Sequence, residues 1–528
     1  MRIRTLVAAA LAAGLALGAA PPTTHREQVQ EREQEEIDAF LRERTAASRT
    51  PGVAYAIVTP DAIEHVGVRG RTGDGDPVTA TTPFLWGSVA KPVTATAVLA
   101  LAEEGALDLD EPVRARLPEF TLADGAGADI TVRQLLDQTS GIPEATGATD
   151  HFERRDDPYG AALAELADVT PLFPPGERFT YSSANYLVLG ALVQAVSGQP
   201  FDTHLRERVL DPLDMTGALT TPEEARAAAL PAGHGYVFGR PVDVAPRYDQ
   251  TGASYGYLGG TVEDLAHFAM AQLNGGSLGG EQVLDPDSVA AAQTGTARIT
   301  DTLRYGLGWR VDERNADLGT RTVWHTGAAP GYFAGVVLLP ELDRGVVVLE
   351  NAYGYFQDAE LVGHALGAAR ILAGGRPDAV AGDPAYPAAL AVLTAVLLGA
   401  AAVVLRSGYR LARPKAAPPG RARVVAGTAG WALGGLALAG LAALAVPRWL
   451  GVDLRTIRLW APDVGWLLVA VALAGLTVAA TRLLVGAVRL RRLRGTPRPG
   501  PAVTGAATGA VTPGTAPAAR PSASPGSG

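Results

Sequence analysis

The stretch FLWGSVAKPVTATAVLALAEEG, residues 84–105, contains the feature from which the rest of the sequence can be interpreted. Lys91 is the only lysine in the first 400 positions, and the other long basic side chains there are all arginines. Ser88 lies three positions before Lys91, so a helix starting here would bring the hydroxyl and the amine onto one face. Pro92 is tolerated only near a helix start, and Gly105 is a typical helix stop. The segment therefore predicts a helix that begins close to Ser88, where unpaired backbone N–H groups can stabilise developing negative charge.

The choice of lysine at this position favours proton transfer. Arginine would supply positive charge but does not lose its proton in a protein, whereas a desolvated lysine can act as a base. A lone S-x-x-K also occurs by chance in a chain of this length, and the alternative is a helix-capping serine beside an incidental lysine. Because lysine is so scarce here, we favour the catalytic interpretation of Ser88 and Lys91.

Two further motifs follow in order: YSSANY at residues 181–186 and HTG at residues 325–327. Together with S-x-x-K they resemble, in order and spacing, the serine β-lactamase and penicillin-binding-protein family, in its class C-like branch. The resemblance continues through PPGERFTYSSANYLVLG and WHTGAAPGYFAGVVLLPELDRGVVVLEN and covers about residues 35–373. It implies an α+β fold, with a five-stranded antiparallel sheet flanked by helices and a helical subdomain. It also implies a serine hydrolase that works through an acyl-enzyme, without a metal or an organic cofactor.

The resemblance implies a role for each motif residue. Ser88 would be the acylated nucleophile, and Lys91 its hydrogen-bonded base or proton relay. Tyr181 would be the partner base, a phenolate or near-phenolate that also delivers the proton to the leaving group. His325 would replace the lysine of the family's K-T-G, on a strand edge that faces the nucleophile. The other oxyanion and substrate-binding positions would be Ser183, Thr326, Gly327 and Ala328, with the backbone N–H groups of Ser88 and Ala328 forming the oxyanion hole.

The proposed chemistry requires shifted pKa values. Free tyrosine and lysine have pKa values near 10, and lowering either to about 7 takes about 4 kcal/mol. Burial lowers the pKa of a lysine, and a neighbouring cation lowers that of a tyrosine, so a buried cluster of Lys91, Tyr181 and His325 could provide both shifts.

Some positions depart from the family's pattern. Where the branch's Y-x-N has asparagine, this sequence has Ser183, which weakens the case for recognition of a β-lactam or a peptide amide. Asn185 is expected to be an ordinary helical residue, and Gln138, in DQTSG, to lie in a structural turn. His325 carries at most partial charge at neutral pH, so it would be a weaker carboxylate anchor than lysine. Esters, D-amino-acid peptides of cell-wall type and β-lactams all stay open as substrates.

Composition limits the other possibilities for this 528-residue chain. It has no cysteine, which excludes disulfides, thiolate metal sites and a cysteine nucleophile. The eight histidines are scattered without a metal-ligand spacing, so no metal site is predicted. Residues 1–20 have the basic start and apolar run of a secretory signal peptide, with an uncleaved anchor as the alternative. The hydrolase domain is expected over residues 27–375, followed by a linker at 376–385.

Three long apolar runs follow the linker, at residues 386–405, 424–446 and 464–486. Each has about the length that a helix needs to cross a hydrocarbon core of ~30 Å. Basic residues gather between the first two runs and after the third, and positive charge near span ends stays in the cytoplasm. The chain is therefore predicted to be a multi-pass protein of the cell membrane with its catalytic domain outside the cytoplasm. The tail, 496–528, is rich in Pro, Gly, Ala and Thr and is expected to be disordered.

Charge separates along the chain in the same way. Residues 384–528 carry 16 basic and 2 acidic side chains, which leaves a net charge of −23 for the rest. So acidic an outer domain is not expected to bind nucleic acid. Its expected partners are a small-molecule or cell-wall peptide substrate and the membrane. The alternative class is a non-catalytic ligand-binding or sensor protein with the same fold, and the intact set of Ser88, Lys91 and Tyr181 speaks against it.

Overall fold

We call the part of the chain before the long C-terminal helices, residues 25–375, the outer domain. Its centre is an antiparallel sheet whose strands come from both ends of this domain. The computed structural model describes residues 25–144, 147–380, 382–413 and 420–494, so the predicted signal peptide and tail lie outside the described residues. The strand order is β2-β1-β14-β13-β12-β11-β10-β9. The strands are β1 (Gly52–Val58), β2 (Ile63–Gly70), β9 (Ala297–Arg298), β10 (Leu303–Tyr305), β11 (Arg310–Asp312), β12 (Thr322–Ala329), β13 (Tyr332–Leu339) and β14 (Arg344–Glu350).

The sheet is wider than the five strands that the resemblance implied. Strands β2, β1, β14, β13 and β12 are seven or eight residues long and form its main part. Strands β11, β10 and β9 have only two or three residues each and extend the sheet beyond β12. Their sequence, with glycines at 306 and 308, is broken into runs too short to identify as sheet strands from periodicity.

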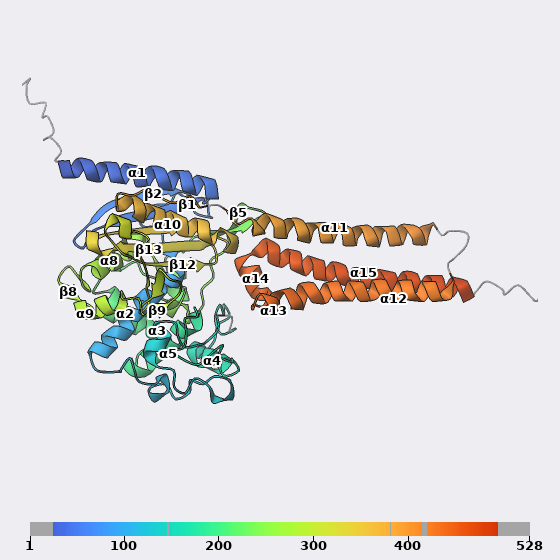
Figure 1. Cartoon of the computed structure of the whole chain (residues 1–528), viewed down its shortest axis with the longest axis horizontal. Coiled ribbons are helices and arrows are strands. Elements are labelled where there is room, and N and C mark those ends of the chain that lie inside the picture. Colours follow the sequence, from blue (N-terminus) through green and yellow to red (C-terminus); the bar gives the residue numbers. More distant parts are fainter. Residues whose placement is uncertain (1–24, 145–146, 381, 414–419, 495–528) are drawn as a thin grey trace, which may run out of the picture.

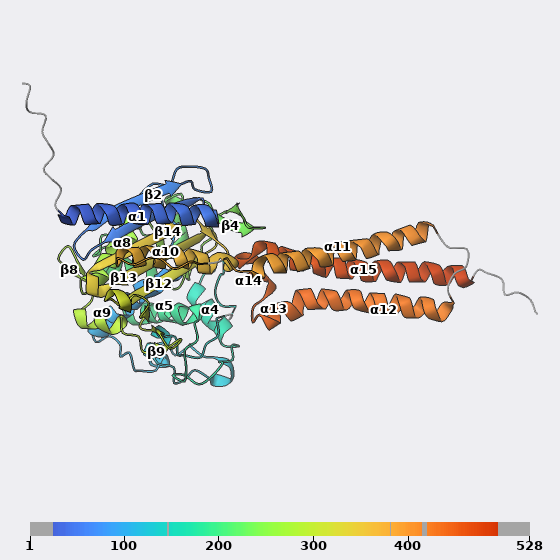
Figure 2. The ribbon, with the colours of Figure 1, turned by 45° about the horizontal axis from the view of Figure 1, so that its top comes forward.

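Helices cover both faces of the sheet (Figures 1 and 2). On one face, α1 (His25–Ser48) and α10 (Asp358–Leu372) pack against alternate strand residues such as Tyr55 and Val337. On the other face, α8 (Val262–Leu273) joins the main hydrophobic core. Alternating residues of β1 and β13 divide between the two clusters, as expected for strands whose side chains point to opposite faces.

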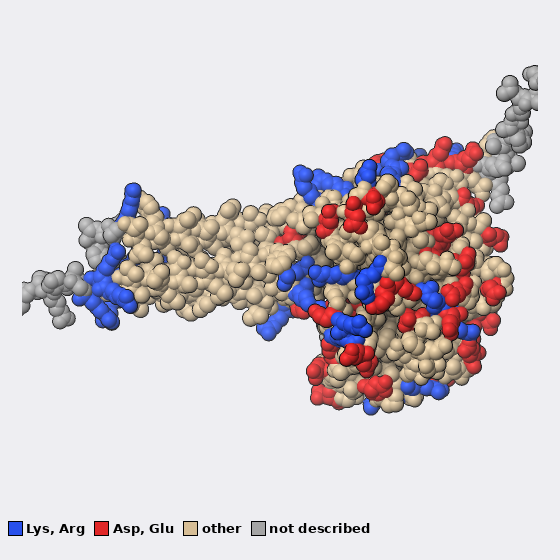
Figure 3. Space-filling view, turned by 180° about the vertical axis from the view of Figure 1, so that it is seen from behind, with Lys and Arg blue, Asp and Glu red and all other residues tan. Residues whose placement is uncertain are grey.

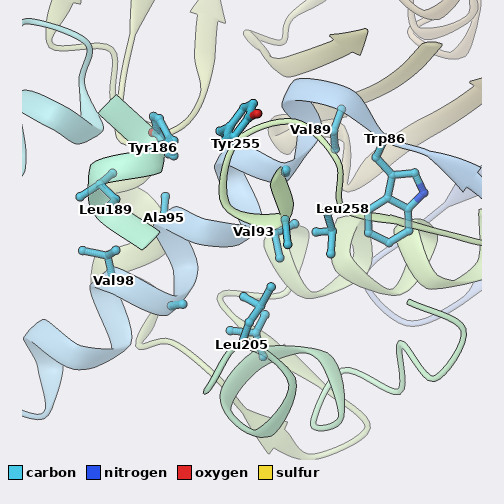
Figure 4. Packing of buried hydrophobic residues seen from close by; sticks show 14 of the residues in the cluster. Trp86, Val89, Val93, Ala95, Val98, Tyr186, Leu189, Leu205, Tyr255 and Leu258 are labelled. Carbon is cyan, nitrogen blue, oxygen red and sulfur yellow. The ribbon is translucent and has the colours of Figure 1, made fainter. Parts of the chain in front are cut away.

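The helical subdomain lies beside the sheet and packs against α2 (Ala90–Glu103). Figure 4 shows Val98 of α2 beside Leu189 of α5, and Val93 of α2 beside Leu258. The helices that complete the outer domain are α3 (Val132–Leu136), α4 (Pro158–Leu166), α5 (Ser183–Ser197), α6 (Phe201–Leu205), α7 (Pro222–Ala227) and α9 (Pro286–Ala292). The remaining short strands are β3 (Phe84–Leu85), β4 (Gly233–Val237), β5 (Arg240–Val244), β6 (Gly259–Gly260), β7 (Ser277–Leu278), β8 (Glu281–Gln282) and β15 (Ala352–Tyr353).

Three helical segments that extend away from the outer domain are long and apolar enough to cross a membrane: Ala385–Ala412, Arg421–Trp449 and Pro462–Arg494. The first is α11 and the third is α15. The second comprises α12 (Arg421–Gly440), a wider helical turn and α13 (Val446–Trp449). These segments run past the predicted apolar runs at both ends because the helices continue into their charged flanks. The short helix α14 (Leu454–Trp460) lies between α13 and α15, next to the outer domain.

The outer domain contacts these helices directly. Asp463, near the start of α15, accepts hydrogen bonds from the backbone N–H of Phe238 (2.8 Å) and the hydroxyl of Tyr386 (2.6 Å). The backbone N–H of Gly239 in turn donates to the Tyr386 hydroxyl oxygen (2.8 Å). The turn between β4 and β5 is therefore tied to the beginnings of both α11 and α15.

Candidate active site

Ser88 lies in a single helical turn, Gly87–Val89, that leads directly into α2, as the sequence predicts. Gly87 has a φ of +54°, a left-handed conformation that favours glycine. The turn holds the Ser88 hydroxyl half-buried at the start of the helix. Pro92 is the third residue of α2, where its missing N–H costs no helical hydrogen bond.

Lys91 is completely buried beneath Ser88. Its Nζ donates hydrogen bonds to Ser88 Oγ (2.9 Å), Ser183 Oγ (3.3 Å) and the backbone carbonyl of Tyr255 (2.8 Å). Burial lowers the pKa of Lys91 to about 7, because the ammonium form loses its hydration. The charge of Glu144 opposes this shift, and that of Arg310 adds to it. At neutral pH a large fraction of Lys91 is therefore uncharged and able to accept a proton.

Tyr181, just before α5, has its ring 4.9 Å from Lys91 Nζ. Burial raises its pKa, and this effect outweighs the opposing effects of Arg310, 5.3 Å from the ring centre, and of a hydrogen bond with Ser88. The structure therefore differs from the expected phenolate: Tyr181 is a neutral phenol at pH 7. The expectation considered the cations near the tyrosine but not the burial of the phenol itself, which has the largest effect on its pKa.

The HTG motif lies on the part of β12 that faces the nucleophile. Pairing between β11 and β12 ends at Trp324, and beyond it a Cβ at Gly327 would overlap the Trp86 carbonyl and the Ser88 backbone N. His325 is fully buried, with Nε2 3.0 Å from the Tyr305 hydroxyl and Nδ1 2.7 Å from the Thr326 carbonyl. Burial, together with the charges of Arg310 and Lys91, holds the pKa of His325 well below its usual value, so its ring is neutral.

The two expected oxyanion-hole amides lie on segments that touch. A Cβ at Gly87 would overlap the backbone N of Ala328, so only glycine allows this approach between the turn and β12. The backbone N–H groups of Ser88 and Ala328 thus belong to two chain segments in direct contact. Thr326, also expected to line the site, is 8% exposed in the same strand.

Glu144 belongs to the site, although the sequence analysis did not identify it. Ser183 Oγ donates to Glu144 Oε1 (2.9 Å), and the Ser183 backbone N–H donates to the other carboxylate oxygen. A continuous chain of hydrogen bonds thus joins Ser88, Lys91, Ser183 and Glu144. Glu144 and Ser183 are 39 positions apart, and the only sequence signal is that Glu144 directly follows SGIP.

Arg310 of β11 is the second residue that the sequence analysis missed. Its guanidinium lies 5.3 Å from the ring centre of Tyr181 and 5.1 Å from that of Trp324, and the side chain is half-buried. In register, Arg310 pairs with Trp324, which immediately precedes His325. Arg310 begins a strand of only three residues, Arg-Val-Asp, and its pairing with β12 could not be predicted from the sequence.

Gln138 has the structural place expected of it. It is buried with a φ of +65°, and its side-chain oxygen accepts from the Ser182 backbone N–H (2.8 Å) and Asn185 Nδ2 (2.6 Å). Ser140 Oγ donates to Asn185 Oδ1 (2.6 Å). These bonds fix the start of α5 and thereby position Tyr181 and Ser183.

Within the described part of the chain, no group of three or more His, Asp or Glu side chains could hold a metal ion.

Comparison with known proteins identifies the family of this chain. The family model described as Beta-lactamase matches residues 37–369, and the chain therefore belongs to the β-lactamase family of serine hydrolases. The chain is 33% identical over 370 residues to Penicillin-binding protein 4 of Amycolatopsis lactamdurans, a match that covers 66% of this chain and 94% of that protein. It is 26% identical to Protein flp of Staphylococcus aureus (strain MRSA252), over 60% of this chain and 63% of the relative.

Solved structures of this family share the fold of the outer domain. The octameric penicillin-binding protein homologue from Pyrococcus abyssi superposes with a TM-score of 0.58 and 26% identity, over 65% of this chain and 78% of that one. The D-alanine carboxypeptidase AmpC from Burkholderia cenocepacia superposes with a TM-score of 0.55 and 23% identity, over 65% of this chain and 99% of that one. The second likeness concerns the fold alone.

Proposed function

We propose that this protein is a membrane-anchored, extracytoplasmic serine hydrolase that works through an acyl-enzyme at Ser88. The observation that carries the proposal is the 2.9 Å hydrogen bond between Ser88 Oγ and the fully buried Nζ of Lys91. A hydroxyl in contact with an amine of depressed pKa is an activated nucleophile.

In the acylation step, neutral Lys91 takes the proton of Ser88 while Ser88 Oγ forms a bond to the acyl carbon. The negative charge that develops on the acyl oxygen is stabilised by the backbone N–H groups of Ser88 and Ala328. The phenol of Tyr181 gives its proton to the leaving group and regains one from the ammonium of Lys91. Water then attacks the ester by the reverse path and releases Ser88.

Glu144 and Ser183 extend this proton path. Lys91 becomes an ammonium while it holds the Ser88 proton, and the carboxylate of Glu144 favours that state through its charge. Ser183 lies between the two, accepting from Lys91 and donating to Glu144. Ser183, which replaces the family's asparagine, thus hydrogen-bonds to the base Lys91 instead of binding a substrate amide.

Arg310 is the cation best placed to attract a substrate carboxylate. Arginine keeps its charge at any physiological pH and binds carboxylates through two parallel hydrogen bonds. His325, by contrast, is neutral and buried. A substrate with a free carboxylate near the scissile bond, as in D-amino-acid peptides and penicillins, fits this arrangement, and the name of the relative Penicillin-binding protein 4 is consistent with it. Esters remain an alternative.

Membrane anchoring is supported by the distribution of charge. Figure 3 shows the three long helices almost free of charged residues along their length, with basic side chains gathered at the end far from the outer domain. Basic residues at one end of membrane helices mark the cytoplasmic side. This arrangement supports a position of the hydrolase domain outside the cytoplasm.

The proposal is tested by intact-mass spectrometry of the full-length protein in detergent after exposure to a fluorophosphonate and, separately, to a penicillin. The control is Ser88→Ala. Adducts that depend on Ser88 with both reagents indicate a penicillin-reactive enzyme, and an adduct with the fluorophosphonate alone indicates an esterase-like or peptidase-like hydrolase. If neither reagent modifies wild-type protein, the hydrolase proposal fails and a ligand-binding protein takes its place.

A further inference from the structure

Helix α14 joins the outer domain to the membrane helices at a particular place. Near its first turn, Arg455 donates hydrogen bonds to the backbone carbonyls of Asp150 (2.8 Å) and Thr149 (3.3 Å). At its last residue, the ring of Trp460 packs edge-on against Tyr353, with ring centres 5.6 Å apart. The two contacts are made to segments about 200 positions apart in the sequence.

The first of these segments is the wall next to Lys91. Asp150 Oδ1 accepts from the Tyr257 hydroxyl (2.7 Å), and the Asp150 backbone N–H donates to the Tyr255 hydroxyl (2.9 Å). Tyr255 also provides the carbonyl that accepts from Lys91 Nζ. Arg455 is therefore linked to the buried amine of Lys91 through Asp150 and Tyr255.

The second segment is the wall next to the oxyanion hole. Trp460 packs against the small hydrophobic cluster of Phe333, Tyr353 and Leu361, and so does Ala328, whose backbone N–H is one of the two oxyanion-hole donors. Tyr353 therefore packs against Trp460 of α14 and belongs to the cluster that Ala328 of β12 contacts. Helix α14 thus contacts two segments, one linked to Lys91 by hydrogen bonds and one that shares a hydrophobic cluster with Ala328.

The position of the bilayer follows from the same region. Helix α15 begins only two residues after α14 ends, and aromatic side chains at this end of the helices are exposed, Trp449 by 85% and Trp466 by 54%. Phe238, 56% exposed, lies in the turn that is bonded to Asp463. Exposed aromatic rings at the ends of membrane helices mark the lipid headgroup level. We therefore infer that the outer membrane surface is at the level of α14, on the side of the outer domain that this helix contacts.

We propose that the substrate is an amphiphile, an ester or amide whose reacting carbonyl is joined to a hydrocarbon anchor in the outer leaflet, and that α14 forms the wall along which this anchor leads to Ser88. The inference rests on the proposed hydrolase function and specifies its substrate class. In the reaction, the acyl C–O or C–N bond breaks and a bond to Ser88 Oγ forms, the leaving group takes a proton, and water later releases the acid.

The test compares two fluorophosphonates with the same reactive group, one carrying an ethyl and one a hexadecyl chain. Full-length protein is reconstituted in phosphatidylglycerol and phosphatidylcholine vesicles, and the rate of Ser88 modification is measured by intact mass. We expect the hexadecyl compound to react at least tenfold faster than the ethyl compound. In the double variant Arg455→Ala/Trp460→Ala, this hexadecyl-to-ethyl ratio should fall at least fivefold.

The matched control is Arg448→Ala/Trp449→Ala, which removes the same two kinds of side chain from exposed positions on α13. It should keep the wild-type ratio, which separates the effect of α14 from simple concentration of the long-chain compound in the vesicles. Modification of Ser88 by the ethyl compound shows that the active site is correctly folded in each variant. A wild-type ratio near one, or an equal ratio in the α14 variant and wild type, overturns the inference. If neither compound modifies the wild-type protein, the hydrolase function itself is refuted.

Discussion

Lys91 is completely buried, and its amine donates to three hydrogen-bond acceptors. Burial favours the neutral amine, whereas the acceptors and the charge of Glu144 favour the ammonium. The balance leaves the pKa at about 7, where a base can both take and return a proton at neutral pH. The activity of the site should therefore depend on small changes around this one side chain.

Replacing Lys91 by arginine should abolish acylation and leave the fold intact. Arginine can occupy a hydrogen-bonded position near Ser88, but it does not lose its proton, so it cannot serve as the base. We expect fluorophosphonate modification to fall by at least a hundredfold, with unchanged circular dichroism. Lys415→Arg, the same exchange at the only other lysine, should react at the wild-type rate. An active Lys91→Arg variant would contradict the proton-transfer role.

The acylation rate should rise with pH through about 7, because Lys91 becomes a base as it loses its proton. The two charged neighbours should move this midpoint in opposite directions. Glu144 raises the pKa of Lys91, so Glu144→Gln should lower the midpoint, whereas Arg310 lowers this pKa, so Arg310→Gln should raise it. The measurement is the pH profile of fluorophosphonate modification for both variants and wild type. Shifts in the same direction would show that the base is not Lys91.

The sequence identified residues of the site whose chemistry is visible locally, but not those that depend on contacts across the fold. Ser88 and Lys91 share one helical turn, so their spacing alone brings them together. Glu144 and Arg310 reach the site only through pairings of distant segments, which a single sequence does not reveal. The predicted phenolate at Tyr181 differs from the neutral phenol for a similar reason. The burial that raises its pKa depends on what packs around the ring, which a single sequence does not reveal.

Among the secondary-structure elements, the close approach of the Gly87–Val89 turn to β12 is the feature on which the proposed oxyanion hole depends. Since a Cβ at Gly87 would overlap the Ala328 backbone, Gly87→Ala should push the two amides apart. We expect a loss of about 1–3 kcal/mol in unfolding free energy, as for other overpacked sites, and a large drop in acylation rate.

Gly105→Ala is the control for that substitution. Gly105 also has a positive φ, +71°, but nothing lies within 4 Å of its Cβ position. It should therefore show only the cost of the left-handed backbone, about 1 kcal/mol, with an unchanged acylation rate. Thermal unfolding of the detergent-solubilised chain measures the first effect, and fluorophosphonate modification the second. Equal acylation rates in the two variants would argue against the oxyanion role of this contact.

At the level of secondary structure, the long elements were predictable and the short ones were not. The antiparallel sheet flanked by helices was expected from the family resemblance, and its five long strands confirm it. Strands β9 to β11 have too few residues to show a period. Their place is determined by pairing with β12 and not by their own sequence.

For the whole molecule, the absence of cysteine makes the membrane topology directly testable. Single cysteines can be introduced at Asp301, exposed on the outer domain, and at Gly420, exposed just before α12. A membrane-impermeant maleimide should label Asp301→Cys in intact cells and Gly420→Cys only after the membrane is opened. The cysteine-free wild type gives the background. Labelling of Gly420→Cys in intact cells would invalidate the proposed orientation.

The bonds between the β4–β5 turn and the starts of α11 and α15 also limit how far the catalytic group can travel. Twelve residues separate the end of α10 from the start of α11, and a free chain of that length could extend by about 40 Å. Because Asp463 and Tyr386 bond the outer domain to the starts of α15 and α11, this linker cannot extend and let the domain move away from the helices. In the proposed membrane arrangement, the catalytic site can therefore act only in a thin layer next to the lipid, and a substrate deeper in the cell envelope would have to diffuse to it.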